Sequence, residues 1–165
     1  MTREEFKLLF ETHFDAIRRY LYFRSGDTVI STDLAQDTFM RIWEKQLDLD
    51  VNRDVGLLYK IAGDLFISHF RRERLARGKM KELSFELEES GPEEDLQTKE
   101  LQARYEKALT RLPEKQRIVF LMSRMEELSY QEIANRLSLS VKAIEKRMSA
   151  ALAQLRKELK PHEKG

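Results

Sequence analysis

Apolar residues recur at helical spacing through the first half of the chain. The first segment carries this stripe at Phe6, Leu9, Phe10, Phe14, Ile17 and Leu21, and the pattern breaks at Ser25-Gly26-Asp27. A second helix is expected from caps at residues 31–33 to about Gln46, and a third over residues 54–79. These helices predict an N-terminal helical domain over residues 1–81.

Helical spacing resumes after a segment that has no apolar period. Residues 82–100 are predicted to be a linker that is extended by the repulsion of its own charges. Beyond it, one stripe ends at Pro113, and Ser129-Tyr130-Gln131-Glu132 forms a capping box that opens a short helix. Ser138-Leu139-Ser140 then makes a tight connection to a last helix. The pattern predicts a second small helical domain over residues 101–165.

Composition supports an all-α fold of two small helical domains joined by an acidic linker. The 165 residues include only 6 Gly and 3 Pro, and 36% are charged. The absence of Cys excludes disulfides and thiolate metal sites. Ile118–Met122 is the longest unbroken apolar run, far short of the roughly 20 residues that span a bilayer. We therefore expect a soluble, cytoplasmic protein without membrane insertion.

Charge is segregated along the chain, although the net charge is only +1. Residues 82–100 carry one basic and eight acidic side chains. Residues 70–81 carry six basic and one acidic, and residues 101–165 carry fourteen and eight. Two basic zones on either side of an acidic segment indicate two contacts with a polyanion such as nucleic acid. Ordinary solvated helix faces would give a similar pattern.

The two helices on either side of residues 138–140 have the spacing of a DNA-binding helix-turn-helix. Short and basic side chains at the start of the second helix suit the edges of bases in a major groove. Ser138 stands at the turn position that Gly often occupies. The candidate DNA contacts are Arg136, Ser140, Lys142, Ala143, Lys146 and Arg147. A plain helical hairpin with a basic face is the alternative.

Two further helices carry candidate sites. Over residues 33–44, an inward side that includes Trp43 leaves an outward face suited to a protein partner, made of Asp33, Gln36, Asp37, Met40, Arg41 and Glu44. The basic end of the helix at 54–79 places Arg beside aromatic residues, as single-stranded nucleic-acid sites do. The alternatives are a solvated face and cations that favour a helix C-terminus.

No catalytic residues are predicted. His13, His69 and His162 lie far apart without ligand spacing, and the chain has no Gly-rich phosphate loop. The sequence therefore predicts no metal, no cofactor and no enzymatic activity.

The order of these motifs resembles the extracytoplasmic-function (ECF) sigma factors of bacterial RNA polymerase. Residues 33–43 resemble their core-binding helix, and Leu58-Tyr59-Lys60-Ile61-Ala62 followed by Arg71-Arg72 resembles their −10 helix. Residues 112–117, 128–134 and 139–142 resemble their −35 domain. The third helix departs from the family pattern at Leu57, Gly63, Asp64 and Ser68.

The resemblance implies a role for each segment. Residues 1–81 would bind core RNA polymerase and the −10 element, residues 82–100 would thread toward the active-site channel, and residues 101–165 would read the −35 element. The outward face at 33–44 would engage the β′ clamp helices, and the β subunit would be a further partner. The −10 contacts would be Asn52, Tyr59, Lys60, His69, Arg71, Arg72 and Arg74. An anti-sigma factor would control the protein.

Two other functions fit part of the sequence. A helix-turn-helix regulator that binds DNA alone, as a dimer, explains residues 110–160 but gives the outward face at 33–44 no role. A helical adaptor without nucleic-acid binding predicts that the chain leaves DNA mobility unchanged at low salt.

Overall fold

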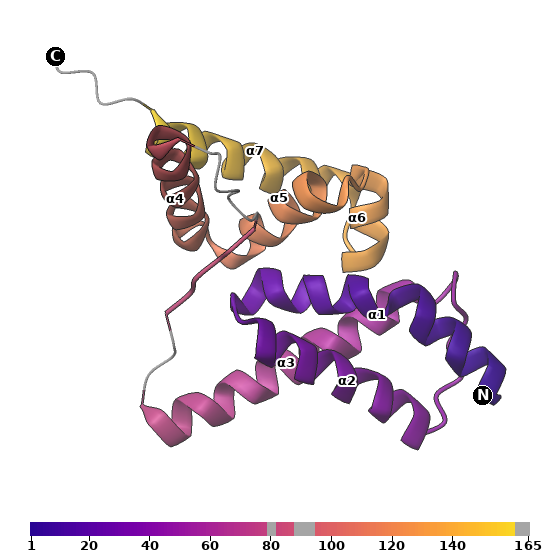
Figure 1. Cartoon of the computed structure of the whole chain (residues 1–165). Helices are drawn as coiled ribbons and strands as arrows, with labels where there is room; N and C mark the ends of the chain where they lie inside the picture. Colours follow the sequence, from indigo (N-terminus) through magenta and orange to yellow (C-terminus); the bar gives the residue numbers. More distant parts are fainter. Residues whose placement is uncertain (79–81, 88–94, 161–165) are drawn as a thin grey trace, which may run out of the picture.

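The computed structural model describes residues 1–78, 82–87 and 95–160. This part of the chain forms seven α-helices and no strand, which confirms the all-α prediction. Figure 1 shows two helical lobes joined by a single connection. The helices of the first lobe are α1 (Arg3–Ser25), α2 (Thr28–Glu44) and α3 (Val55–Arg77), and those of the second are α4 (Leu96–Arg111), α5 (Glu114–Glu126), α6 (Tyr130–Leu137) and α7 (Val141–Leu159).

Local caps set the ends of α1 and α2. Thr2 and Glu5 form a capping box at the start of α1, and Gly26 ends that helix with a φ of 65°. The Asp27 side chain accepts a hydrogen bond from Ile30 N at 3.0 Å. Because Asp27 already satisfies this amide, α2 begins at Thr28, earlier than the caps predicted at residues 31–33.

Each lobe encloses apolar side chains that follow the helical period. In the first lobe these are fully buried, at Ile17 and Leu21 of α1, Phe39 and Ile42 of α2 and Leu58 of α3. In the second they include Leu109, Val119, Leu121, Ile133 and Ile144. Burial of each such side chain contributes about 1.5–3 kcal/mol. The packing therefore fixes which face of each helix is left for binding.

The linker is more structured than its charge predicts. Asp95 caps α4 by accepting from Thr98 N at 2.8 Å, so helix begins at Leu96, inside the segment expected to be linker. Residues 82–87 pack against the helices despite the negative charge of the segment. The Phe85 side chain is buried there and is only 2% exposed. Its ring lies 5.7 Å from that of Tyr22, whose hydroxyl accepts a bond from Glu86 N. Residues 88–94, which hold four of the eight acidic side chains of the predicted linker, lie outside the described residues.

The two lobes pack against each other. α1 contacts α5, and α3 contacts α6. In Figure 1 the second lobe lies across α1, and α6 is at the end of this lobe that contacts α3. In the part of the chain that the structure describes, no helix is long and apolar enough to cross a membrane.

The Ser129 capping box is expected to contribute measurably to the stability of the second lobe. The Ser129 side chain accepts from Glu132 N at 3.1 Å, and the Glu132 side chain accepts from Ser129 N at 3.1 Å. Ser129→Ala should lower the free energy of unfolding by about 1 kcal/mol, measured by urea denaturation. Ser149→Ala, in the exposed middle of α7, is the matched control and should leave stability unchanged or slightly raised. Equal values for both variants would contradict the cap's contribution.

Candidate functional site

The outward face of α2 is exposed, as its spacing predicts. Leu34, Ala35, Thr38, Phe39 and Ile42 are buried against the first lobe. The six candidate partner-binding residues all lie on the exposed side, at Asp33, Gln36, Asp37, Met40, Arg41 and Glu44. The face thus carries both charge signs and one flexible apolar side chain.

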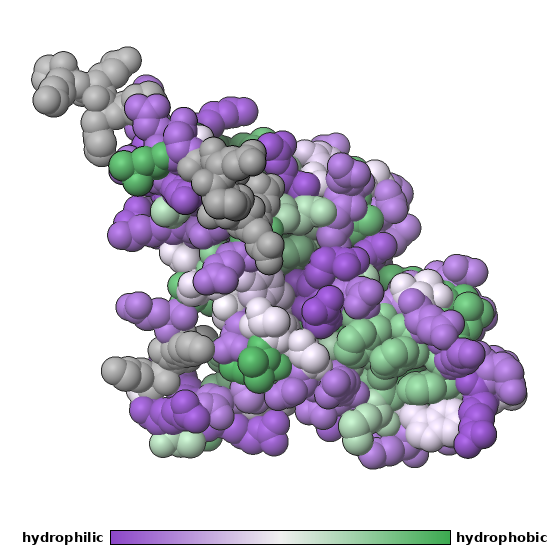
Figure 2. Space-filling view, viewed as in Figure 1, coloured by the Kyte–Doolittle hydropathy of each residue, from purple (hydrophilic) through white to green (hydrophobic). Residues whose placement is uncertain are grey.

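The position of Trp43 differs from the one predicted from the sequence. It was expected on the inward side, but 37% of it is exposed. Its ring lies 5.1 Å from Phe6 of α1, at the edge of the core. Phe10 of α1 and Met40 of α2 are exposed as well, so apolar side chains adjoin the charged face. Figure 2 shows apolar surface gathered over α1 and α2. The run Phe6, Phe10 and Phe14 was the available signal in the sequence, since the three rings pack around Phe39 and Phe10 remains exposed.

The loop between α2 and α3 is closed by its own carboxylates. Asp50 accepts from the backbone amides of Asn52 and Arg53, at 2.9 and 2.7 Å. The Asp54 carboxylate accepts a hydrogen bond from Asp50 N at 2.7 Å. These bonds hold the pKa of Asp50 and of Asp54 below the usual range. His13 of α1 anchors the loop from behind, with Nε2 2.6 Å from Val51 O. Asn52 therefore lies exposed on a loop whose conformation these hydrogen bonds hold.

The structure divides the residues that were expected to bind DNA along α3. Lys60, Arg71, Arg72 and Arg74 are exposed, and His69 is half-buried beside Phe70. Tyr59, in contrast, is only 2% exposed, and burial raises its pKa to about 12. Its hydroxyl accepts from Arg136 Nη1 of α6 at 3.0 Å. Two candidate DNA contacts from different lobes therefore bind each other.

The second lobe contains a helix-turn-helix with the predicted three-residue turn. α6 ends at Leu137 and α7 begins at Val141. Ser138 adopts a left-handed φ of 56°, and its amide bonds back to Ala134 O. Ser140 caps α7 by accepting from Ala143 N at 3.1 Å. Serine thus fills the turn position without Gly, at the modest strain of a positive φ.

Side chains near the start of α7 differ in their exposure. Lys142 and Lys146 are exposed, whereas Ala143 is half-buried. Arg147 is half-buried too, and it lines a pocket of about 580 Å³ between the lobes with Arg24 and Glu114. Arg136 and Arg147 therefore lie partly in the lobe interface, while the two lysines face solvent.

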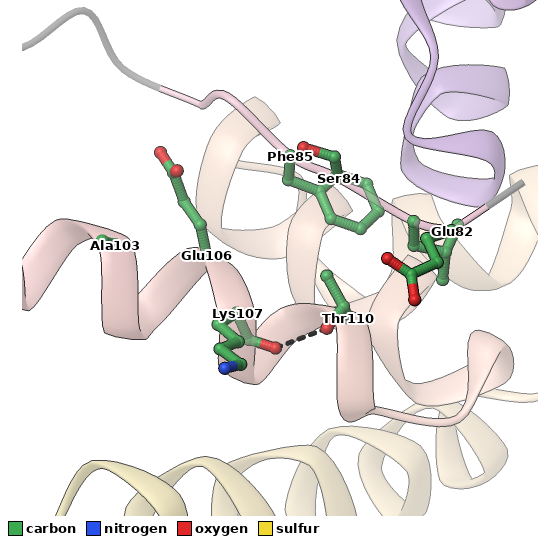
Figure 3. A pocket seen from close by; sticks show the side chains of 8 residues that line it. Glu82, Ser84, Phe85, Ala103, Glu106, Lys107 and Thr110 are labelled. Atoms are coloured by element: carbon green, nitrogen blue, oxygen red, sulfur yellow. Dashed lines mark hydrogen bonds between the residues drawn. The ribbon is translucent and has the colours of Figure 1, made fainter.

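The segment at residues 82–87 lies over α4. It borders a pocket of about 510 Å³ together with Ala103, Glu106, Lys107 and Thr110. Figure 3 shows Ser84 and Phe85 above the α4 side chains, with Thr110 bonded to Lys107 O. Among the described residues, no group of three or more His, Asp or Glu side chains could hold a metal ion.

Each of the two lobes matches a separate protein-family model. Residues 9–76 match sigma-70 region 2, and residues 102–155 match sigma-70 region 4. The ferric citrate uptake sigma factor FecI of Escherichia coli is 28% identical over 150 residues, covering 89% of this chain and 86% of that protein. The ECF RNA polymerase sigma factor SigW of Bacillus subtilis is 25% identical, covering 96% and 90%.

Two solved structures share the fold. RpoE of Bartonella quintana, solved in complex with the anti-sigma factor NepR, has a TM-score of 0.70 at 24% identity, covering 97% of this chain and 99% of RpoE. CnrH, solved in complex with the cytosolic domain of CnrY, has a TM-score of 0.64 at 24% identity, covering 98% and 92%. Both lobes of the present fold are therefore found together in other proteins.

Proposed function

The chain belongs to the sigma-70 family, within its extracytoplasmic-function group, and from that premise we propose that it binds core RNA polymerase and directs it to promoters with defined −10 and −35 elements. One observation carries this proposal. Both sigma-70 regions stand in order on one chain, with an exposed mixed-charge helix face in the first and a helix-turn-helix in the second.

The exposed face of α2 is our candidate for the polymerase contact. Asp37 and Arg41 lie one turn apart on it, and Met40 adds an adaptable apolar side chain between them. Interfaces of this kind combine an apolar centre with charged residues that fix orientation. The patch of Phe10, Met40 and Trp43 would supply that apolar centre. The partner expected there is the pair of clamp helices of the β′ subunit.

A groove in the second lobe suits a further polymerase contact. It measures about 730 Å³ and runs between α4, α5 and α7. Phe120, Leu152 and Leu155 give it an apolar floor, and Arg124 and Arg156 stand at its rim. We assign this groove to the β subunit. Binding there would place the second lobe upstream of the first along the promoter DNA.

The helix-turn-helix is assigned to the −35 element. The start of α7 would enter the major groove, where Lys142, Lys146 and Arg147 reach bases or adjacent phosphates. Ser140 and Ala143 are short enough to let the helix approach closely. Arg136 would contact a phosphate once it is free of Tyr59.

The −10 element is assigned to α3 and to the loop before it. Lys60, Arg71, Arg72 and Arg74 would neutralise phosphates. His69 and Tyr59 could pack on an unstacked base, which offsets the few kcal/mol that opening the stack costs. Asn52, held on the closed loop, would contact the displaced strand.

Loosening that loop should impair promoter opening. Asp50→Ala removes the acceptor for the Asn52 and Arg53 amides, so Asn52 is no longer held in one place. We expect slower formation of the open complex, followed by permanganate reactivity of the −10 thymines, with unchanged affinity for core polymerase. Asp48→Ala, also exposed in the same loop, is the matched control. Equal opening rates for the two variants would count against a role for the loop.

The protein performs no chemistry in this mechanism. It couples a protein-binding equilibrium to two DNA-binding equilibria, and the polymerase supplies the catalysis. It would work in the cytoplasm, where polymerase and promoters are. We also propose that an anti-sigma protein controls this chain. The structurally similar RpoE was solved in complex with such a protein, NepR. A protein that covered the α2 face would exclude polymerase directly.

Run-off transcription tests the proposal. The purified chain, bacterial core RNA polymerase and genomic fragments should give discrete transcripts that core enzyme alone does not produce. A helix-turn-helix regulator would instead bind a palindromic site without polymerase and would give no such transcripts.

A further inference from the structure

A histidine stands at a core position of α1. His13 lies four residues after Leu9 and four before Ile17, on the face of α1 that packs into the first lobe, and it is only 8% exposed. A buried imidazole costs free energy unless its ring nitrogens find hydrogen-bond partners. What the polar edge of His13 contacts therefore decides its role.

The partner of His13 is the main chain of the loop between α2 and α3. Its Nε2 atom lies 2.6 Å from Val51 O, although the two residues are 38 positions apart in the sequence. A carbonyl oxygen only accepts hydrogen bonds, so Nε2 carries the proton and donates it. The bond therefore ties a long helix to the loop that carries Asn52.

Alternate residues of this loop face the core and the solvent. Leu49 is 7% exposed and Val51 packs against the core, whereas Asp50 and Asn52 are exposed. Apolar contacts are not directional. The burial of Leu49 and Val51 therefore places the loop on the first lobe, but it does not fix the orientation of the peptide groups between them and Asn52.

One peptide group of the loop is hydrogen-bonded on both sides. The C=O of the Val51–Asn52 peptide accepts from His13, and its N–H donates to Asp50 Oδ1 at 2.9 Å. Because a peptide group is planar, bonds at its two opposite edges fix the orientation of the whole plane. The Cα atom of Asn52 lies in this plane, so the two bonds also fix the place from which the Asn52 side chain leaves the loop.

The two bonds attach this peptide group to different parts of the molecule. Asp50 belongs to the loop itself, so its bond moves with the loop. His13 belongs to α1, which packs against both α2 and α3. The His13 bond therefore sets the orientation of Asn52 relative to α3, the helix that carries the cations assigned to the −10 phosphates.

Building on the proposed function, we propose that His13 is a positioning residue for recognition of the −10 element. It does not touch DNA, because it is buried behind the loop. It holds the Val51–Asn52 peptide group in one orientation, so that Asn52 meets a base of the displaced strand at a defined place. Without this bond the cations of α3 still bind phosphates, but Asn52 no longer selects among bases.

Two substitutions of His13 separate the hydrogen bond from the packing. His13→Phe fills the buried place with a ring that has no N–H, whereas His13→Gln has an amide N–H at about the reach of Nε2. Open-complex formation by each holoenzyme is measured on promoters randomised over the −10 element. His13→Phe should lose at least about fivefold of the base discrimination within this element, and His13→Gln should stay within about twofold of the wild type.

Ala16→Gly is the matched control for a weakened α1. Ala16 is buried on the same helix three residues from His13, and Gly there lowers helix stability without removing the bond to the loop. Its −10 profile should equal that of the wild type. Core-polymerase affinity and the −35 profile should be unchanged in all three variants, since the loop takes part in neither. A −10 profile altered alike in Ala16→Gly and His13→Phe would contradict the proposal.

A double-mutant cycle tests whether His13 acts through Asn52. If it does, His13→Phe should cause no further loss of −10 discrimination in a protein that already carries Asn52→Ala. Additive losses would overturn the proposal. An unchanged −10 profile for His13→Phe, or equal losses for His13→Phe and His13→Gln, would overturn it as well.

A measurement on the wild-type chain does not depend on how the variants fold. The Nε2–H proton of His13 should exchange slowly with water and give a nitrogen-coupled NMR signal that is missing from His13→Phe. Its absence from the wild type would overturn the bond. If the wild type gave no transcript with core polymerase, the proposed function would fail instead. A defined wild-type −10 profile that His13→Phe leaves unchanged would reject the positioning role alone.

Discussion

Reversing the charges of Asp37 and Arg41 together lowers the affinity for core RNA polymerase by about 100-fold, or about 2.7 kcal/mol. Asp37→Arg with Arg41→Asp keeps an i, i+4 pair on α2, so helix stability changes by only a few tenths of a kcal/mol. Across an interface, however, each side chain now meets its own charge sign, and such juxtapositions cost several kcal/mol. The affinity is measured by fluorescence titration of labelled chain with core enzyme.

A matched reversal on α4 controls for charge placement as such. Glu100 and Arg104 are also exposed, opposite in charge and four residues apart, but they lie in the second lobe. Glu100→Arg with Arg104→Glu should retain wild-type affinity. If both double variants bound polymerase like the wild type, the α2 face would not be the core-binding surface.

Lys146→Ala and Arg147→Ala should each change which −35 sequences are recognised. A side chain that makes a bidentate base contact contributes about 1–3 kcal/mol to discrimination, so the preferred base should lose about 5- to 150-fold of its advantage. Holoenzyme binding to a library of −35 variants measures this. Arg147 also lines the pocket between the lobes, so Arg147→Ala removes a side chain from that interface as well.

Lys157→Ala separates base reading from phosphate binding on the same helix. Lys157 is exposed near the end of α7 and is expected to contact only the backbone. Its loss should weaken all sequences alike and reduce the salt slope by about one. An unchanged −35 profile for Lys146→Ala and Arg147→Ala, alongside this uniform effect of Lys157→Ala, would remove the reading role of α7.

The sequence by itself determined the existence of the helices, the Ser129 cap of α6 and the outward face of α2. These features depend on residues within one or two turns of each other. The Ser129 capping box joins positions three apart, and the three-residue turn before α7 follows from caps on either side of it. Apolar spacing also predicted the buried side of α2, except for Trp43, because a 3.6-residue period gives a face but not its edge.

Only the tertiary structure decided what the candidate residues touch. Arg117 bonds Phe23 across 94 positions, and Arg136 bonds Tyr59 across 77. No period in the sequence encodes such pairs, since they depend on how two folded surfaces fit. The missing side chain at Gly56 lets Ser138 approach α3, and the open carbonyls of α1 receive Arg117. Local spacing thus made the two lobes and their binding faces, whereas shape and unsatisfied polar groups decided that the lobes close on each other.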